Sequence, residues 1–390
     1  MDTEFFELAD YKKTGEISLS DEEKLIRAAV FLREGGLVAF PTETVYGLGG
    51  NALLPEASKH IYAAKGRPSD NPLIVHVADM ESLRSLVKEI PAMAKILAAK
   101  FWPGPLTMIM EKSPKVPYET TGGLETVAIR MPSDKAAMEL IKLSGVPVAA
   151  PSANTSGRPS PTTALHVKED LDGKIDAIVD GGPTGIGVES TIVDVSGEEP
   201  VLLRPGAITL EMLENCLKEA VDIDPALEKP MDSGLHPKAP GMKYKHYAPK
   251  APMVIVQGDF YEGCDGIEDG MKIYEELMKI VNAVKALVNE NSAPGKRVGV
   301  ICSDETWEYY FEEGATIPKE KIYKTESIDL RSIGSRKDEK SIAHNLYAVL
   351  RDFDDENIDY IIAEGVDPRK LGYAIMNRMQ KAAAQHIIRV

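Results

Sequence analysis

Several short polar segments of this 390-residue chain carry residue types that can bind anions and orient a small polar ligand. The first runs from Pro41 to Gly49, directly after an apolar stretch, and includes Glu43 and Thr44. Polar residues in Gly-rich loops at the carboxyl ends of strands commonly bind ligands in α/β folds. The same composition also suits an ordinary turn in which Glu43 is exposed to water, so both interpretations stay open.

A second segment places two cations around a glycine, in the order Lys65, Gly66, Arg67. Such a pair can clamp phosphate oxygens, since Arg offers a bidentate fork and Lys a point charge. The alternative is helix termination, because a glycine with basic neighbours also suits the end of a helix. His76 lies at the end of the strand that follows, where a lone histidine is more often structural than catalytic.

Further polar residues lie at strand ends. Ser152 and Asn154 follow an apolar run, and their hydroxyl and amide groups can orient a ligand or simply form a turn. Arg130 and Arg204 each end an apolar strand and need an anionic partner, which a ligand or an internal carboxylate could supply. The glycine-rich segment 181–187 lacks the Lys-Ser/Thr of a phosphate loop and is interpreted as a turn.

Together these residues form a cation set and a hydroxyl/amide set, nearly all at predicted strand ends. Such a combination fits a nucleotide polyphosphate bound beside a small carboxylate-bearing molecule. No Ser-His-Asp order, Cys-His pair or pair of catalytic carboxylates stands out, so the chemistry would rest on positioning and charge stabilisation. The members of the two sets are Lys65, Arg67, Arg130 and Arg204, and Thr44, Asn71, Ser152, Asn154 and Ser190.

Alternating helix and strand signals place these segments in an α/β domain over residues 1–220, with a sheet covered on at least one face. Ser20 and Glu23 read as a capping box that starts the first long helix. The predicted strands of this domain are 37–40, 73–77, 106–110, 126–130, 146–150, 177–179, 191–195 and 201–204. Its other predicted helices are 56–64, 80–100, 135–143 and 162–171.

Residues 221–251 lose this periodicity and are predicted to be a proline-rich linker. Its second half, 238–250, holds four lysines and no acidic residue, which reverses the sign of the rest of the chain. A second, smaller doubly wound domain is predicted for residues 252–390. Its expected strands are 253–256, 298–301 and 360–363, and its final helix is expected over 373–386.

Composition narrows the class of protein. The net charge of −16 argues against broad contact with nucleic acid. Three widely spaced cysteines, an acidic N-terminus without a secretory signal, and the lack of a long apolar run predict a cytoplasmic protein without a membrane span. They also exclude a cysteine-based zinc site, and no metal site is predicted from the residues.

The ordered set of motifs resembles the YrdC-like domain of L-threonylcarbamoyladenylate synthases. The resemblance rests on the segments 41–48, 65–73, 151–157 and 189–192. The segment 240–247 and the ending 372–378 look like the long, two-domain form of that family. Ala239 and Lys245 depart from the family pattern, which usually has Ser and Arg there, and both substitutions keep the local character.

The resemblance implies that L-threonine, bicarbonate or CO₂, and ATP yield threonylcarbamoyl-AMP and pyrophosphate, with Mg²⁺ assisting. A separate transferase complex would then use the product to modify tRNA. By analogy, the catalytic cluster is Lys65, Arg67, Ser152 and Asn154, and the threonine-binding residues are Thr44, His76, Arg130, Ala150 and Ser190. ATP would be held by Arg67, Asn71, Thr126, Ser152, Ser160, Arg204 and Tyr244.

The resemblance also gives the basic linker a role as a lid that excludes water from a labile carbamate. Its expected lid residues are Lys243, Tyr244, His246 and Tyr247. Two alternatives remain: an RNA-binding module that contacts tRNA through the linker, and carbamoyl-adenylate transfer as in hydrogenase maturation proteins. The acidic charge disfavours a stable tRNA complex, and the chain lacks the cysteine motifs and acylphosphatase module of the maturation proteins.

Overall fold

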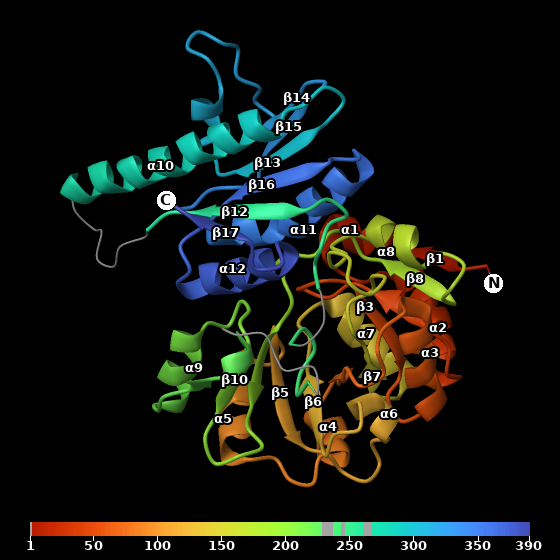
Figure 1. Ribbon diagram of the computed structural model, residues 1–390. Coiled ribbons are helices and arrows are strands. Elements are labelled where there is room, and N and C mark those ends of the chain that lie inside the picture. Colours follow the sequence, from red (N-terminus) through yellow and green to blue (C-terminus); the bar gives the residue numbers. More distant parts are fainter. Residues whose placement is uncertain (1, 228–236, 243–245, 260–266) are drawn as a thin grey trace. The chain divides into compact units, whose positions relative to one another are not determined.

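Residues 2–227, 237–242, 246–259 and 267–390 are described in the computed structural model. The chain folds into two compact units, residues 1–244 and 245–390. Each unit has its own sheet and its own apolar core (Figure 1). The two-domain α/β fold predicted from the alternating pattern is therefore confirmed.

The first unit is built on a mixed sheet of eleven strands in the order β1-β8-β2-β3-β7-β4-β6-β5-β9-β10-β11. The sheet contains both parallel and antiparallel pairs; β4 and β6, for example, are parallel, and the adjacent pair β5 and β6 is antiparallel. The strands are β1 (Glu4–Glu7), β2 (Val38–Phe40), β3 (Gly47–Asn51), β4 (Ile74–His76), β5 (Leu106–Glu111), β6 (Thr126–Arg130), β7 (Val148–Ala149), β8 (Ala177–Asp180), β9 (Thr191–Asp194), β10 (Val201–Arg204) and β11 (Asp222–Ile223).

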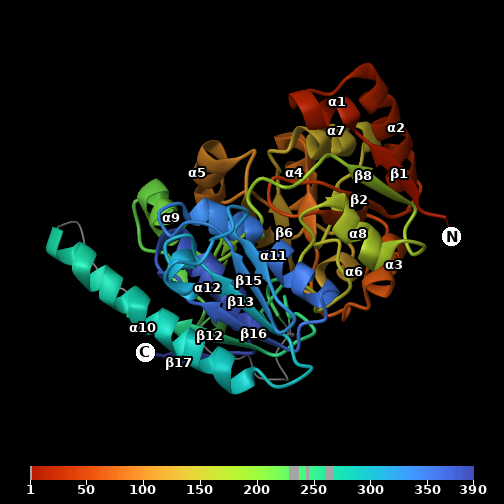
Figure 2. The ribbon, with the colours of Figure 1, turned by 90° about the horizontal axis from the view of Figure 1, so that it is seen from above.

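Helices cover this sheet, and α2 packs beside α7 over one part of it (Figure 2). The helices of the unit are α1 (Ala9–Thr14), α2 (Leu19–Arg33), α3 (Pro55–Lys65), α4 (Met80–Leu86), α5 (Ala92–Phe101), α6 (Tyr118–Thr121), α7 (Lys135–Ser144), α8 (Ala164–Leu171) and α9 (Leu210–Leu217), with a 3-10 turn at Pro225–Leu227. None of the helices among the described residues of either unit is both long and apolar enough to cross a membrane.

The start of α2 differs from the expected capping box at Ser20 and Glu23. The cap is Ser18, whose side chain accepts a hydrogen bond from the backbone N–H of Asp21. Leu19 begins the helix although it is exposed. A serine two residues earlier satisfies an otherwise unpaired N–H at the helix start, so the prediction placed the boundary two residues too late.

The loop predicted over Pro41–Gly49 is wrong at its end, because residues 47–49 belong to the buried strand β3 (Gly47–Asn51). Three of its five residues are glycines, which normally weaken a strand. The fold requires them, because a Cβ on Gly49 would lie 2.8 Å from both Phe40 and Val148 side-chain atoms. Close packing between neighbours in the sheet therefore outweighs the low strand propensity of glycine.

One face of the sheet is covered partly by helices and partly by the linker. Ala239 and Met242 are buried against a cluster formed by Ile74, Ile109, Ala128, Ile192 and Leu203. These residues come from β4, β5, β6, β9 and β10, the half of the sheet farthest from β1. The described part of the linker therefore packs on the first unit as a cover for these strands.

The second unit has a six-stranded sheet in the order β14-β15-β13-β16-β12-β17, in which all pairs except β14 with β15 are parallel. Helix α10 lies on one face, and α11 and α12 lie on the other (Figure 1). The elements are β12 (Met253–Gln257), α10 (Ile267–Asn291), β13 (Val298–Cys302), a 3-10 turn at Trp307–Tyr310, β14 (Ile322–Lys324), β15 (Ile328–Ser332), α11 (Glu339–Asp355), β16 (Tyr360–Glu364), α12 (Lys370–Ala382) and β17 (Ile387–Arg389).

The C-terminal end corrects the expected final helix over 373–386. Helix α12 ends at Ala382, and the chain continues into β17, which pairs in parallel with β12. Ala384 and Gln385 adopt positive φ angles of 48° and 65°, and this left-handed turn ends the helix. Short strands β14 and β15 were also missed, because their polar residues do not show a buried-strand pattern.

Candidate active site

Strand register brings residues far apart in the sequence onto one face of the sheet. His76 on β4 and Thr107 on β5 are both direct partners of Arg130 on β6. Directly paired residues point to the same side, so the three side chains share a face. Thr107 was not predicted, and the only signal for it was a threonine inside an otherwise apolar strand.

On this face, the part of the sheet covered by α2 and α7 meets the part covered by the linker residues Ala239 and Met242. Val148, the antiparallel partner of His76, belongs to the core beneath α2 and α7. Ile74, which is two residues before His76 and therefore on the same side of β4, belongs to the cluster beneath Ala239. The polar residues around Arg130 thus occupy the boundary between the helix-covered and the linker-covered parts of the sheet.

Arg130 is the centre of the polar group at the carboxyl ends of β4 and β6. Its Nη1 donates a 2.9 Å hydrogen bond to Oγ1 of Thr44. Its Nη2 lies 2.8 Å from Oε2 of Glu43, and the exposed fractions of the two side chains are only 5% and 14%. The sequence left open whether Glu43 is exposed to water, and the structure places its carboxylate inside, beside a buried cation.

His76 is fully enclosed and electrically neutral at neutral pH. Burial, together with the smaller effect of the positive charge of Arg130, lowers the pKa of its imidazole to about 3. Its ring meets the edge of Phe40 at a centroid distance of 6.2 Å. His76 therefore adds no second positive charge beside Arg130.

A chain of hydrogen bonds links Ser190, which is predicted to bind threonine, to Arg204, which is predicted to bind ATP. Oγ of Ser190 lies 2.8 Å from Oγ1 of Thr107. Arg204 donates to the Ser190 carbonyl at 2.9 Å through Nε and to its hydroxyl at 3.1 Å through Nη2. Since Thr107 is the strand partner of Arg130, this chain extends the Arg130 group towards β9 and β10.

A second polar group consists of Lys65, Ser152 and Asn154, and hydrogen bonds from Lys65 connect its members. The Nζ of Lys65 donates to the carbonyl of Ser152 at 2.5 Å and to the carbonyl of Asn154, and Oγ of Ser152 donates to Oδ1 of Asn154 at 2.5 Å. Gly66 also ends α3 in the left-handed conformation, with φ of 65°. The helix-termination interpretation is therefore confirmed, while phosphate binding by Lys65, which is only 2% exposed and turns into the protein, stays a prediction.

Arg67 extends this group towards the amino ends of β4 and β6. Its Nε and Nη2 donate to the carbonyls of Asn71 and Pro72 at 3.2 and 3.0 Å. Pro72 lies two residues before Ile74, and Thr126 lies two residues before Ala128, the partner of Ile74. Thr126 begins β6, at the opposite end of the strand from Arg130.

The loop between β2 and β3 joins the two polar groups. Thr44 contacts Arg130, and Gly47, three residues later, forms a bridge with Ser152. The backbone N–H of Ala150 donates to the carbonyl of Ile74, which fixes the approach of that segment. Ser160 donates to Oε1 of Glu189, next to Ser190.

The four predicted cations are all buried, which requires anionic or carbonyl partners around them. In the described part of the chain, no group of three or more His, Cys, Asp or Glu side chains gathers to hold a metal ion. The arrangement can therefore hold an anionic ligand through cations and carbonyl-fixed loops.

The expected lid residues fall in two places. Lys243 and Tyr244 lie outside the described residues. His246 and Tyr247 belong to the second unit, where the Tyr247 ring stacks on Tyr347 at a centroid distance of 5.3 Å. Tyr247 is buried there, so the described linker residues that cover the first unit's sheet precede the lid motif.

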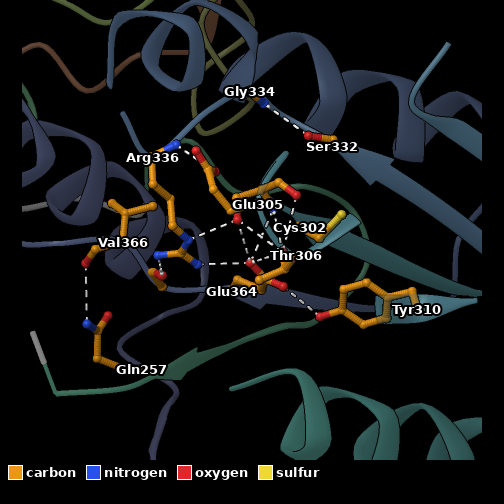
Figure 3. A network of polar contacts seen from close by, with 12 residues as sticks. Gln257, Cys302, Glu305, Thr306, Tyr310, Ser332, Gly334, Arg336, Glu364 and Val366 are labelled. Carbon is orange, nitrogen blue, oxygen red and sulfur yellow. Dashed lines mark hydrogen bonds and ion pairs between the residues drawn. The ribbon is translucent and has the colours of Figure 1, made fainter. Parts of the chain in front are cut away.

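A separate polar network lies at the carboxyl ends of the strands of the second unit (Figure 3). The carboxylate of Glu364 accepts hydrogen bonds from Thr306 at 2.8 Å, Tyr310 at 2.7 Å and Arg336 at 2.9 Å. Arg336 also donates to Ser303 and to the carbonyl of Gly365, each at 2.9 Å. This buried, well-partnered ion pair fixes the loops that follow β13 and β16.

Comparisons with known proteins cover nearly the whole chain. A family model described as "Telomere recombination" matches residues 30–206, and one described as "Threonylcarbamoyl-AMP synthase, C-terminal domain" matches residues 208–384. The chain is 47% identical to the threonylcarbamoyl-AMP synthase of Pyrococcus abyssi, over 95% of this chain and 97% of that protein. It is 46% identical to that of Bacillus subtilis, over 96% and 97%.

Similarity in structure is equally extensive. The crystal structure of P. abyssi Sua5 complexed with L-threonine matches all of both chains, with a TM-score of 0.83 and 44% sequence identity.

Proposed function

Because the chain belongs to the threonylcarbamoyl-AMP synthase family, we propose that it makes threonylcarbamoyl-AMP from L-threonine, bicarbonate or CO₂, and ATP, releasing pyrophosphate. The observation that carries this proposal is the full-length likeness to a threonine-bound Sua5, combined with a buried Arg130 beside Thr44. No comparison favours the alternative of an RNA-binding module.

In this proposal, threonine would bind at the carboxyl ends of β4 and β6. The guanidinium of Arg130 would hold its carboxylate, and the hydroxyls of Thr44 and Ser190 would orient its polar groups. Neutral His76 and the backbone at Ala150 would line the same pocket. The shared strand face of His76 and Arg130 and the Arg130–Thr44 hydrogen bond support this placement.

ATP would bind along the residues held together by Lys65 and extend to Arg204. In the reaction, the threonine nitrogen gains CO₂ to form a carbamate, whose oxygen attacks the α-phosphorus of ATP while pyrophosphate leaves. Both reactants are anions, so buried cations offset their repulsion and stabilise the leaving group. The residues proposed for this end are Lys65, Arg67, Asn71, Thr126, Ser152, Asn154, Ser160 and Arg204.

Mg²⁺ would neutralise phosphate charge in such a reaction. Since the described residues gather no set of three or more metal-ligating side chains, the ion is assigned no protein site and no step. An ion held mainly by ATP phosphates and water is consistent with the way Mg²⁺ binds in many nucleotide sites.

The linker is proposed to act as a lid over this pocket. The burial of Ala239 and Met242 against the strands that carry the site supports this, because it fixes the linker next to the pocket. Lys243 and Tyr244 follow directly, and Tyr244 would reach ATP. His246 and Tyr247 would anchor the far end of the lid, consistent with the stacking of Tyr247 on Tyr347.

The product would pass to a tRNA threonylcarbamoyl transferase complex, since threonylcarbamoyl-AMP is a reactive mixed anhydride that needs an acceptor. We propose a cytoplasmic location for this exchange. No stable complex of the chain itself with tRNA is expected, given its net charge of −16.

The test is release of pyrophosphate from ATP and bicarbonate by the full chain, with and without L-threonine. Threonine-dependent release is expected, with threonylcarbamoyl-AMP identified as the nucleotide product. Pyrophosphate release that does not depend on threonine, or no pyrophosphate release at all, would contradict the assignment. Replacing residues 243–245 by Gly and Ser, which spares the buried Tyr247, should keep the fold and sharply reduce product if the lid proposal holds.

A further inference from the structure

Glu43 and Arg130 form a buried ion pair whose hydrogen-bonding capacity is largely unfilled. Among the described residues, neither carboxylate oxygen of Glu43 accepts a hydrogen bond, and neither Nε nor Nη2 of Arg130 donates one. This holds although Oε2 and Nη2 are 2.8 Å apart, so the two groups attract each other without an aligned hydrogen bond. Buried polar groups are usually satisfied, so two such groups side by side call for an explanation.

The backbone around both residues is well fixed. The carbonyl of Glu43 accepts a hydrogen bond from the N–H of Ile186 at 2.8 Å, and the carbonyl of Thr44 accepts one from Gly187 at 3.0 Å. Arg130 ends β6 and uses Nη1 to hold Thr44. The unfilled donors and acceptors therefore belong to a firmly held loop and strand, as in a binding site organised before its ligand arrives.

The unfilled groups match the two charged ends of an α-amino acid. The Nε and Nη2 edge of a guanidinium is a fork that takes a carboxylate through two parallel hydrogen bonds. Carboxylate oxygens without donors suit an ammonium group, which offers three N–H donors. An α-amino acid carries both charges on one carbon, so it needs its anion-binding and cation-binding partners next to each other.

The neighbouring side chains His76 and Asp134 do not take the place of a ligand's ammonium group or of the Glu43 carboxylate. The pKa of His76 is lowered to about 3 by burial, so its ring is neutral and does not compete with an ammonium for Glu43. Asp134 caps the start of α7, because its carboxylate accepts a hydrogen bond from the backbone N–H of Ala137 at 2.9 Å. It also accepts a hydrogen bond from the hydroxyl of Tyr11 at 3.0 Å. Asp134 is therefore engaged in the fold, and Glu43 has oxygens to offer.

We propose that Glu43 recognises the α-ammonium group of the amino-acid substrate, next to the Arg130 guanidinium on the substrate carboxylate. This inference rests on the proposed placement of threonine at Arg130. In this arrangement Glu43 holds the nitrogen that must later react with CO₂, and it makes the site selective for zwitterions over simple carboxylic acids. A purely structural counter-ion would instead pair with Arg130 through aligned hydrogen bonds and would not distinguish between these ligands.

The experiment compares two ligands on two proteins by calorimetry with the full chain. The ligands are L-threonine and (R)-3-hydroxybutanoate, which lacks only the amino group. Wild type should prefer threonine, and Glu43→Gln should lower threonine affinity by about tenfold or more while changing the affinity for the analogue little. The preference for the amino group should therefore disappear in the variant.

Two further variants make the result decisive. Glu43→Asp keeps the charge and should retain part of the preference, and circular dichroism checks that each variant is folded. Asp134→Asn removes a nearby carboxyl while keeping a capping residue, and it should preserve the preference.

Each other outcome has a distinct meaning. If wild type binds neither ligand, the proposed threonine site itself fails. If wild type prefers threonine and Glu43→Gln keeps the same preference, the site stands and the role of Glu43 is overturned. Equal losses for both ligands in Glu43→Gln, or loss of the preference in Asp134→Asn, would also overturn a direct contact between Glu43 and the ammonium group.

Discussion

The burial of the neutral His76 beside Arg130 predicts a specific dependence of stability on pH. The perturbation is His76→Gln, which keeps a polar side chain and removes the titrating ring. In the folded protein the pKa of His76 is lowered to about 3, against about 6.5 for an exposed histidine. Between these values the unfolded chain binds a proton that the folded chain does not, so His76 destabilises the fold as the pH falls below about 6.5.

The size of the effect follows from the two pKa values. Lowering the pH from about 7 to about 5 should cost the parent protein about 2 kcal/mol through His76 alone. Asp134 acts in the opposite direction, because burial raises the pKa of its carboxyl to about 6 and protonation then favours the folded state. That contribution is present in both proteins and largely cancels in their difference.

The assay uses urea unfolding of the first unit at the two pH values. The chain has two tryptophans, so a Trp307→Phe background leaves Trp102, in the first unit, as the fluorescent reporter. The difference in unfolding free energy between His76→Gln and its parent should move by about 2 kcal/mol in favour of the variant at the lower pH. His60→Gln, at an exposed position on α3, is the matched control.

A pH-independent difference between His76→Gln and its parent would refute the reasoning. It would mean that the imidazole is protonated in the folded state or is reached by water. An equal shift in His60→Gln would point to a general effect of removing a histidine and would refute it as well.

Three other changes test separate parts of the structure. Lys65→Met removes the ammonium that donates to the Ser152 carbonyl, so kcat/KM for pyrophosphate release should fall by about 100-fold with an unchanged circular dichroism spectrum; a fall below about threefold would contradict its role. Gly206→Ala would put a Cβ 2.4 Å from the backbone nitrogen of Thr191, so the first unit should lose about 1–3 kcal/mol and threonine affinity should drop in calorimetry; unchanged values for both would show that this loop can yield. Glu364→Ala leaves a buried guanidinium without its carboxylate, so the second unit should lose about 3–5 kcal/mol in urea unfolding followed through Trp307 in a Trp102→Phe background; an unchanged midpoint would contradict the role assigned to the network.

Much of the fold could be predicted from the sequence. Apolar runs located most of the central strands, and helix signals located α2, α3 and α7. The errors occurred where a local rule was outweighed by packing or by a neighbouring cap. Glycine-rich β3 was expected to be a loop, because nothing local reveals that Phe40 and Val148 leave no room for a side chain at Gly49. The last helix was extended past Ala382, because its turn depends on two non-glycine residues with positive φ.

The sequence by itself also determined which residue types were available for binding and that they lie at the ends of elements. It could not say which of them meet. Arg130 and Thr44 are 86 positions apart, and Thr107 and Ser190 are 83 positions apart, and both pairs are joined by hydrogen bonds. Local patterns encode helical and strand periods, whereas strand order and register are set by packing between distant segments. Only the tertiary structure therefore turned Glu43 from a possible surface residue into the buried neighbour of Arg130.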